Sequence, residues 1–533
     1  MLAHLELIIF GLLVAVTSFV LLASISRVPY PVFLVVGGLA LSLVPGLPAI
    51  ELPPDLVFLI FLPPLLYSAA FFSSPRDLKA QIRPIALLSI GLVLLTTVTV
   101  AVVGHVAIGL SWPVAFVLGV IVSPTDPVTV ASTAERLGLP RNIITILEGE
   151  SLINDGTALA LYRTAVAAVV AGSFSILNAG LEFVLSGIGG AAIGLAVGWT
   201  ISRVRWWVED PLVETTIALL TGYAAYLPAE ELGASGVIAV VVTGLYLSWQ
   251  SPKMTSPRNR LQVFEVLWVM DFLLNSVLFI LIGLQLSTIS GELSGESPAM
   301  LVLYALLVSS AVIITRLVWT FPMAYLPHYL SRRMRERNPF PPWRQVTFVS
   351  YAGMRGGVSL AAALSLPLTV GSGEPFPGRD LVIFLTFCVI LVTLVLQGLN
   401  LPLLVRRLGL EDDGEEEHEE NEARLRAAEA PLERIEELEG EEWVRDDTAE
   451  RMRELYEYRR RRFAARSTGQ SENGNGEEDG YEERSLAYQR LRRELLSAER
   501  EALIQLRDEG RISDSVRGRI ERDLDLEDTR LEI

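Results

Sequence analysis

The stretch SPTDPVTVASTAERLGLPRNIITILEGESLINDGTALALYR, residues 123–163, joins two long apolar segments that both contain residues a lipid-spanning helix normally avoids. The first segment is interrupted by PTDP at 124–127, and the second carries the acidic and amide side chains of EGESLIND at 148–155. A carboxylate at the centre of a bilayer costs about 2.5–3.5 kcal/mol on insertion scales, so it is retained where it has a function or a partner. The rest of the chain is therefore interpreted as a scaffold for these two segments.

The composition indicates a polytopic membrane protein. The chain has 533 residues, of which 51% are hydrophobic, and its mean hydropathy is +0.42. Apolar runs of about 20 residues, the length that crosses a bilayer as a helix, recur along the sequence. We predict an all-α fold with thirteen spans, over residues 5–24, 29–46, 56–72, 84–108, 112–134, 142–170, 178–201, 212–228, 233–249, 263–286, 298–325, 345–368 and 380–404.

Basic residues in the loops predict the orientation of these spans. The loops after the odd-numbered spans contain 18 Lys and Arg residues, whereas the opposite set contains only Arg379. Positive charge is enriched on the cytoplasmic side of membrane proteins. We therefore expect the N-terminus outside and the C-terminal tail in the cytoplasm, with the protein in the plasma (inner) membrane.

The sequence predicts two domains, a transmembrane domain over residues 1–410 and an acidic cytoplasmic tail over 411–533. The tail contains 39 Asp and Glu against 22 Lys and Arg, which accounts for the whole net charge of −17. This charge argues against nucleic acid or anionic lipid as its partner. Helix-forming sequence over 421–466 and 482–508 flanks a polar linker at 467–480. A packing or self-association segment and a regulatory domain both fit this pattern, and the partner of the tail stays open.

The prolines of the fifth span predict an unwound segment inside the membrane. Pro124 and Pro127 each disfavour helical geometry in the residue before them, and Pro127 cannot donate to a helical ladder. Thr125 and Asp126 lie between these two breaks. Irregular backbone at membrane depth persists only where protein or a water-filled cavity surrounds it, and transporters use such broken helices to bind ions. A structurally hydrogen-bonded Asp126 in a kinked helix is the alternative.

The sixth span supplies a second set of oxygen ligands. Its polar residues form two pairs at i, i+4 spacing on neighbouring faces, Glu150 with Asn154 and Ser151 with Asp155. Carboxylate, hydroxyl and amide oxygens suit a hard cation such as Na⁺, and the lack of accompanying His or Cys argues against zinc or copper. A carboxyl group in a desolvated site can hold a proton or a cation near neutral pH, and exchange requires only that competition.

The twelfth span contains a third element, GMRGGVS at 353–359. Its three glycines weaken the helix and permit close approach of backbone. Arg355 requires an anion, and we expect an ion pair with Glu150, whose role is either structural or in shaping the ion site. The fifth and twelfth spans run in opposite directions, so two interrupted spans in these positions fit an inverted repeat.

Six motifs together resemble the prokaryotic branch of the monovalent cation:proton antiporter-1 family, the NhaP-like sodium/proton exchangers. They are LPPLLYSAAF (62–71), SPTDPV (123–128), EGESLINDGTAL (148–159), FLLNSVLFILIGLQL (272–286), GMRGGVSLAAALSLP (353–367) and LVLQGLNLPLLVRRLGL (394–410). The resemblance implies thirteen helices with crossed broken helices, elevator-type exchange of Na⁺ for H⁺, and a homodimer. In the family, an Asn-Asp pair goes with electroneutral one-for-one exchange.

The same resemblance implies roles for individual residues. Asp155 would be the shared proton and cation carrier, and Na⁺ would also be coordinated by Asp126, Ser151 and Thr125. Asn154 would stabilise the site, and the Glu150–Arg355 pair would hold the sixth and twelfth spans together. Ser68 departs from the family pattern, because many relatives have glutamate there.

Three further polar residues lie within predicted spans, and their roles are secondary. Asp271 and Asn275 are an i, i+4 pair in the tenth span, and Arg316 lies in the middle of the eleventh. A structural Asp271–Arg316 pair is favoured over a role in ion binding.

The sequence also argues against several other classes of function. No phosphate-binding loop of the GxxxxGK[ST] type occurs, and no nucleophile–base pair or His-based metal cluster indicates an enzyme. We expect no cofactor beyond the transported Na⁺ (or Li⁺ or K⁺) and H⁺. The alternative is a monovalent cation channel or sensor gated by the tail, although a carbonyl filter loop of the TVGYG type is absent from the sequence.

Overall fold

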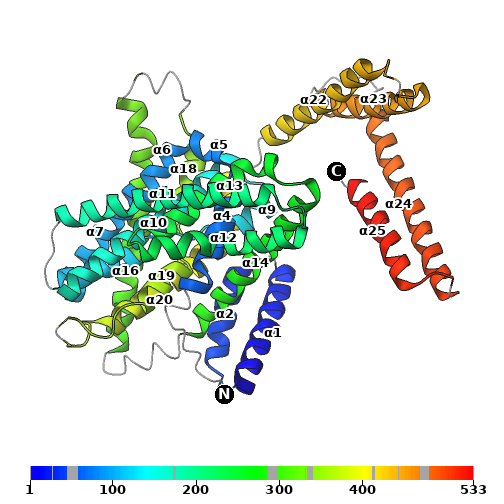
Figure 1. Cartoon of the computed structure of the whole chain (residues 1–533). Coiled ribbons are helices and arrows are strands. Elements are labelled where there is room, and N and C mark those ends of the chain that lie inside the picture. Colours follow the sequence, from blue (N-terminus) through cyan, green and yellow to red (C-terminus); the bar gives the residue numbers. More distant parts are fainter. Residues whose placement is uncertain are drawn as a thin grey trace. The chain divides into compact units, whose positions relative to one another are not determined.

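The computed structural model describes residues 2–26, 28–44, 58–171, 176–285, 297–330, 332, 340–371, 373–410, 414–441, 443–468, 479–509 and 511–531 (Figure 1). These residues form helices, and the strand-like pairing among them is a single bridge between Thr369 and Pro375. The chain divides into two compact units, Met1–Asp412 and Asp413–Ile533. Most of the linker predicted at 467–480 lies outside the described residues.

Within the first unit, one set of helices packs together and is called here the first bundle. It consists of α1 (Leu2–Ser26), α2 (Tyr30–Ser42), α4 (Leu62–Phe72), α11 (Ile176–Trp206), α12 (Pro211–Glu231), α13 (Gly236–Met254) and α14 (Pro257–Leu284). Helices α2 and α14 cross closely, because a Cβ on Gly38 would lie 2.3 Å from the Ile280 carbonyl oxygen. Glycine is therefore required there for the two backbones to touch.

The remaining helices of this unit form the second bundle, which packs around α10 (Arg141–Ala171) and α16 (Pro298–Leu330). Two long helices of this bundle contain π-helical turns. The first consists of α6 (Ile82–Ala86), η1 (Leu87–Leu92), α7 (Val93–Val103) and η2 (Gly104–Ile108). The second consists of α20 (Arg379–Leu391), η3 (Val392–Gln397) and α21 (Gly398–Leu408). The short helix α5 (Pro75–Ala80) precedes the first of these long helices.

Both predicted interruptions are confirmed. The fifth span divides into α8 (Trp112–Ile121) and α9 (Val128–Leu137), and the twelfth into α18 (Trp343–Tyr351) and α19 (Gly357–Leu364). The residues between α8 and α9 include both prolines of PTDP, and those between α18 and α19 include Gly353 and Gly356. The local sequence thus explains both breaks.

Several helices have the length and composition of membrane spans. Among the described residues, five are long and apolar enough to cross a bilayer: Ile82–Ile108, Gly180–Trp206, Pro257–Leu284, Pro298–Tyr329 and Arg379–Leu408. Shorter apolar helices accompany them, including Tyr30–Ser42 and Trp112–Ile121. The shorter elements are those that the breaks divide or that end near undescribed segments, so the count of thirteen spans stays a prediction.

The second unit consists of α22 (Glu415–Leu438), α23 (Asp446–Thr468), α24 (Asp479–Asp508) and α25 (Asp514–Leu531). The helix expected over 421–466 is divided in two near Gly440, and α25 extends beyond the helices predicted from the sequence. Helices α24 and α25 pack together, with Arg500 bonded to Asp525 and Asp528 at 2.9 Å each. Exposed ion pairs of this kind contribute about 0–1 kcal/mol each, so the apolar contact around buried Leu496 matters more.

Candidate functional site

The two unwound segments touch each other through hydrogen bonds. The Asp126 backbone N–H donates to the Met354 carbonyl at 2.8 Å, and the Arg355 Nε donates to the Val122 carbonyl at 3.0 Å. Unwinding frees backbone groups that lipid cannot satisfy, and each break supplies partners to the other. The crossing therefore fixes the position of Asp126 from both halves of the chain.

Gly356 makes this close approach possible. A Cβ on Gly356 would lie 1.8 Å from Oδ2 of Asp126, which leaves room for no residue except glycine. The other oxygen, Oδ1, accepts the backbone N–H of Val128 at 2.9 Å. Asp126 thus lies at the start of α9 and beside the start of α19, where the positive ends of both helix dipoles favour a negative charge.

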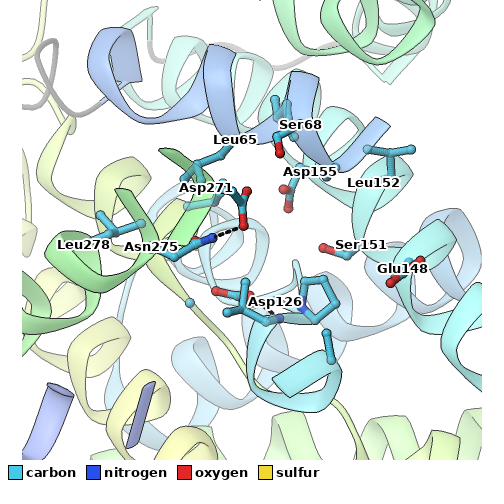
Figure 2. A pocket seen from close by; sticks show the side chains of 18 of the residues that line it. Leu65, Ser68, Asp126, Glu148, Ser151, Leu152, Asp155, Asp271, Asn275 and Leu278 are labelled. Carbon is cyan, nitrogen blue, oxygen red and sulfur yellow. Dashed lines mark hydrogen bonds between the residues drawn. The ribbon is translucent and has the colours of Figure 1, made fainter. Parts of the chain in front are cut away.

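A cavity of about 330 Å³ lies beside the crossing and receives carboxylates from three different elements. Figure 2 shows Asp126, Asp155 and Asp271 around one space, together with Ser68 and Ser151. Asn275 and Thr125 also line it. The structure thereby brings together the acidic, hydroxyl and amide groups that the sequence separates by up to about 200 residues.

Asp155 lies near the middle of the unbroken helix α10 and is only 7% exposed. Its carboxylate has no hydrogen bond or ion pair to any described residue, and it shares the cavity with the carboxylate of Asp126. One turn earlier, the Ser151 hydroxyl donates to the Thr125 carbonyl at 2.8 Å. Helix α10 is thus held against the first break at the level of both aspartates.

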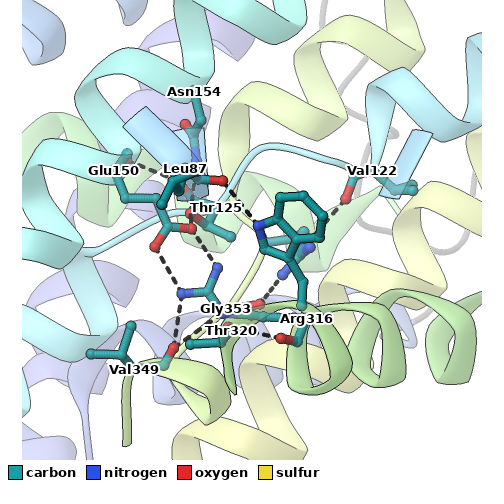
Figure 3. A network of polar contacts seen from close by, with 12 residues as sticks. Leu87, Val122, Thr125, Glu150, Asn154, Arg316, Thr320, Val349 and Gly353 are labelled. Atoms are coloured by element: carbon teal, nitrogen blue, oxygen red, sulfur yellow. Dashed lines mark hydrogen bonds and ion pairs between the residues drawn. The ribbon is translucent and has the colours of Figure 1, made fainter. Parts of the chain in front are cut away.

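A polar network, shown in Figure 3, is joined to the cavity through Thr125, which lines it. The Thr125 hydroxyl donates to Glu150 Oε1 at 3.0 Å and accepts from Asn154 Nδ2 at 2.8 Å. Asn154 is absent from the cavity lining, and Glu150 is 1% exposed. The structure therefore places both residues in the network that fixes Thr125.

Arg316, and not Arg355, is the ionic partner of Glu150. Its NH1 contacts Oε1 and its NH2 donates to Oε2 at 2.8 Å, which gives a two-pronged pair with both side chains 1% exposed. Arg316 also donates to the Val349 carbonyl through Nε and NH2, at 3.2 and 2.9 Å. The pair joins α10 to α16 and to the end of α18.

The predicted Glu150–Arg355 pair is therefore wrong in its partner. Arg355 runs along the breaks, where its Nε and NH1 donate to the carbonyls of Val122 and Gly353. Its NH2 has no hydrogen-bond partner among the described residues. The unwound backbone leaves carbonyl oxygens close to the Arg355 guanidinium. These oxygens accept its hydrogen bonds in place of a carboxylate.

The predicted Asp271–Arg316 pair is also wrong. Asp271 Oδ2 accepts from Asn275 Nδ2 at 3.0 Å, which is the i, i+4 contact read from the sequence, and the carboxylate faces the cavity. Ser68 is fully buried and lines the same cavity as Asp271. Arg316 instead forms its ion pair with Glu150 on α10.

One buried charge cluster was missed from the sequence. Arg205 and Glu214 are each 1% exposed, and Arg205 NH2 donates to Glu214 Oε1 at 2.7 Å. Thr255 and Asn259 donate to the same carboxylate at 2.9 and 2.6 Å. Arg205 is one of the 18 basic residues counted above in the predicted loops, and its spacing of nine residues to Glu214 across a short turn is the signal that identifies the pair.

Comparison with known proteins gives the same architecture and a family. A family profile described as "Sodium/hydrogen exchanger, transmembrane" matches residues 11–407. A Mycobacterium tuberculosis protein named as an uncharacterized Na⁺/H⁺ exchanger is 37% identical over 529 residues, which is 98% of this chain and 96% of that protein. The Na⁺/H⁺ antiporter ApNhaP of Aphanothece halophytica is 35% identical over 390 residues, 73% of this chain and 71% of the antiporter.

Among solved structures, the sodium proton antiporter MjNhaP1 of Methanocaldococcus jannaschii has a TM-score of 0.58 at 21% identity, over 76% of this chain and 98% of that one. This likeness shows a shared fold. The profile match and the relatives above 30% identity confirm the resemblance to NhaP-like exchangers. The chain belongs to the sodium/hydrogen exchanger family of membrane proteins and is a cation/proton antiporter, a transporter and not an enzyme.

Proposed function

We propose that the chain exchanges Na⁺ for H⁺, with Asp155 as the shared carrier and Asp126, Ser151 and Thr125 as additional oxygen ligands. Li⁺ and K⁺ stay open as alternative cargo. The observation that carries this proposal is the pair Asp126 and Asp155, which share one cavity where no described cation pairs with Asp155. A buried carboxylate without a counter-charge is costly, so Asp155 requires either a proton or a metal cation.

Competition between the two cargoes gives coupling. A proton or an Na⁺ on Asp155 neutralises the same charge, so either loaded form is cheaper to move through the protein interior than the empty carboxylate. If Asp126 keeps the same charge throughout, replacing one proton by one Na⁺ moves no net charge per cycle. This gives electroneutral one-for-one exchange without a cofactor.

The division of the site between two bundles supports an elevator-type cycle. Asp126, Ser151 and Asp155 lie on α8–α10 of the second bundle, whereas Ser68 and Asp271 face them from α4 and α14 of the first. A sliding motion of the second bundle would carry its aspartates past a fixed wall, as alternating access requires.

A homodimer is part of the same proposal. The 18-residue apolar window of α11 is only 11% buried, so most of this helix surface is left for lipid or a second subunit. Because α11 belongs to the first bundle, a partner subunit packed against α11 would hold that bundle fixed.

Contacts between helix ends support the proposed orientation. The Asp77–Arg141 pair at 2.8 Å and the Arg205–Thr255 contact at 3.3 Å join loops that the sequence assigns to the cytoplasm. At the opposite end, Tyr162 bonds Ser365 at 2.8 Å. We place the first end in the cytoplasm of a plasma (inner) membrane, with the tail on that side and the N-terminus outside.

Everted vesicles test the proposal directly. With Asp155→Asn, addition of Na⁺, Li⁺ or K⁺ to acidified vesicles should release no protons, while the wild type responds. Repeating the assay with and without an imposed membrane potential measures electroneutrality. Normal exchange in Asp155→Asn would overturn the carrier assignment, and a steady current without a proton requirement would indicate a channel.

A further inference from the structure

We propose that Asp271, Ser68 and Asn275 form a second cation-binding station on the first bundle, which loads the cation before it passes to Asp155. The proposal rests on the Na⁺/H⁺ exchange assigned above, and adds a site on the opposite wall of the same cavity. The term "loading station" is used below for these three residues.

Asp271 has the surroundings of an ion ligand. It lies near the middle of α14, and one carboxylate oxygen accepts from Asn275 Nδ2 at 3.0 Å. No described Lys or Arg forms an ion pair with it. Figure 2 shows the carboxylate directed into the cavity, toward the side on which Ser68 lies. A carboxylate at this depth without a positive partner indicates a binding role.

Ser68 supplies a second observation. Its side chain is 0% exposed, it lines the cavity, and its hydroxyl has no hydrogen-bond partner among the described residues. An unsatisfied buried hydroxyl costs about 1–3 kcal/mol, a penalty that a ligand in the cavity removes. Figure 2 shows its hydroxyl oxygen on the side that faces the carboxylates of Asp155 and Asp271.

Asn275 completes an oxygen set. Its Nδ2 donates to Asp271, which leaves the carbonyl oxygen Oδ1 of this cavity-lining residue as an acceptor. One carboxylate, one hydroxyl and one amide carbonyl are hard oxygen ligands of the kind that alkali cations take from proteins. The loading station therefore fits a small monovalent cation.

The position of the station makes its effect one-sided. Asp155 and Asp126 belong to the second bundle, and the loading station belongs to the first, so movement between the bundles changes the separation of the two sets. The cavity extends from both sets toward Ser73, Ser132 and Glu148, near the helix ends placed in the cytoplasm. The station thus meets cations that enter from this side, where an added negative charge raises their local concentration.

Sided transport measurements test the loading station. In everted vesicles, where the cytoplasmic face is outermost, Asp271→Asn should raise KM for Na⁺ about tenfold, the factor that ~1.4 kcal/mol of binding produces. In right-side-out vesicles KM for external Na⁺ should change less than about twofold, since the station then faces away from the loaded carrier. Ser276→Ala is the matched control, because Ser276 is buried on the same helix outside the cavity lining.

Relocating the carboxylate separates binding from folding. Ser68→Glu combined with Asp271→Asn returns one carboxylate to the same station from α4, and should restore the cytoplasmic KM. If Asp271→Asn does not accumulate in the membrane, Ser68→Ala is measured instead and should raise the same KM. Unchanged KM in Ser68→Ala, or equal changes of KM on both faces in Asp271→Asn, would overturn the station.

Parallel measurement of Asp155→Asn distinguishes the two proposals. If Asp155→Asn abolishes exchange while Asp271→Asn leaves both KM values unchanged, the carrier assignment holds and the loading station is wrong. If Asp155→Asn exchanges normally, the carrier itself has been assigned wrongly.

Discussion

Replacing Arg316 by alanine should strongly destabilise the protein. The substitution leaves Glu150, 1% exposed, without its two-pronged partner and removes two donors from the Val349 carbonyl. Orphaning one member of a buried ion pair costs about 3–5 kcal/mol. A free-energy change of 1 kcal/mol shifts the melting temperature of a long chain by roughly 2 °C, so the loss corresponds to about 6–10 °C.

Heating in detergent followed by size-exclusion chromatography measures this shift. The informative comparison is a double-mutant cycle, since Glu150→Gln in the Arg316→Ala background should cost much less than Glu150→Gln alone. The matched cycle uses Arg355→Ala, which removes a guanidinium that contacts carbonyls instead of Glu150. A coupling of Glu150 to Arg355 larger than its coupling to Arg316 would refute the assignment of the pair.

Three further substitutions address other parts of the structure. Gly356→Ala should abolish exchange, because its Cβ would lie 1.8 Å from Asp126 Oδ2. Gly180→Ala is the control, because a Cβ there meets nothing within 4 Å. Normal exchange in Gly356→Ala would contradict the close contact between the two unwound segments. Thr125→Val should lower stability by about 1–3 kcal/mol by leaving two buried partners short of a bond, whereas Thr386→Val, which loses a bond within its own helix, should cost less on heating. Truncation after Leu410 should retain vesicle exchange with an altered pH profile, and total loss of exchange in correctly inserted protein would assign the tail to the transport machinery.

The breaks and the shared cavity could be predicted because they depend on local chemistry. Proline and glycine interrupt helices wherever they occur in a span, so PTDP and GMRGG identified both unwound segments. Periodicity and composition were sufficient for these features.

The pairing of the buried arginines could not be predicted, because it depends on the direction of each side chain in the folded bundle. At least four carboxylates within predicted spans, Asp126, Glu150, Asp155 and Asp271, are candidate partners for Arg316 and Arg355, and sequence separation does not rank them. In the structure, Arg316 forms an ion pair with Glu150, and Arg355 donates hydrogen bonds to backbone carbonyls. These carbonyls are available as acceptors only because the helices are unwound there. An acceptor created by the fold itself has no signature in the sequence.

The crossing of the two breaks also has a consequence for biogenesis. Arg355 Nε and the Val122 carbonyl are separated by 233 positions in the chain. At about 5–20 residues per second of synthesis, the first break waits roughly 10–50 s for its partner. During that interval the backbone N–H and C=O groups of the first break lack their partners from the second break. Water or a membrane chaperone must supply hydrogen bonds to them. Quality control of this protein therefore depends on the last third of translation, when the second break arrives and the membrane unit first becomes self-sufficient.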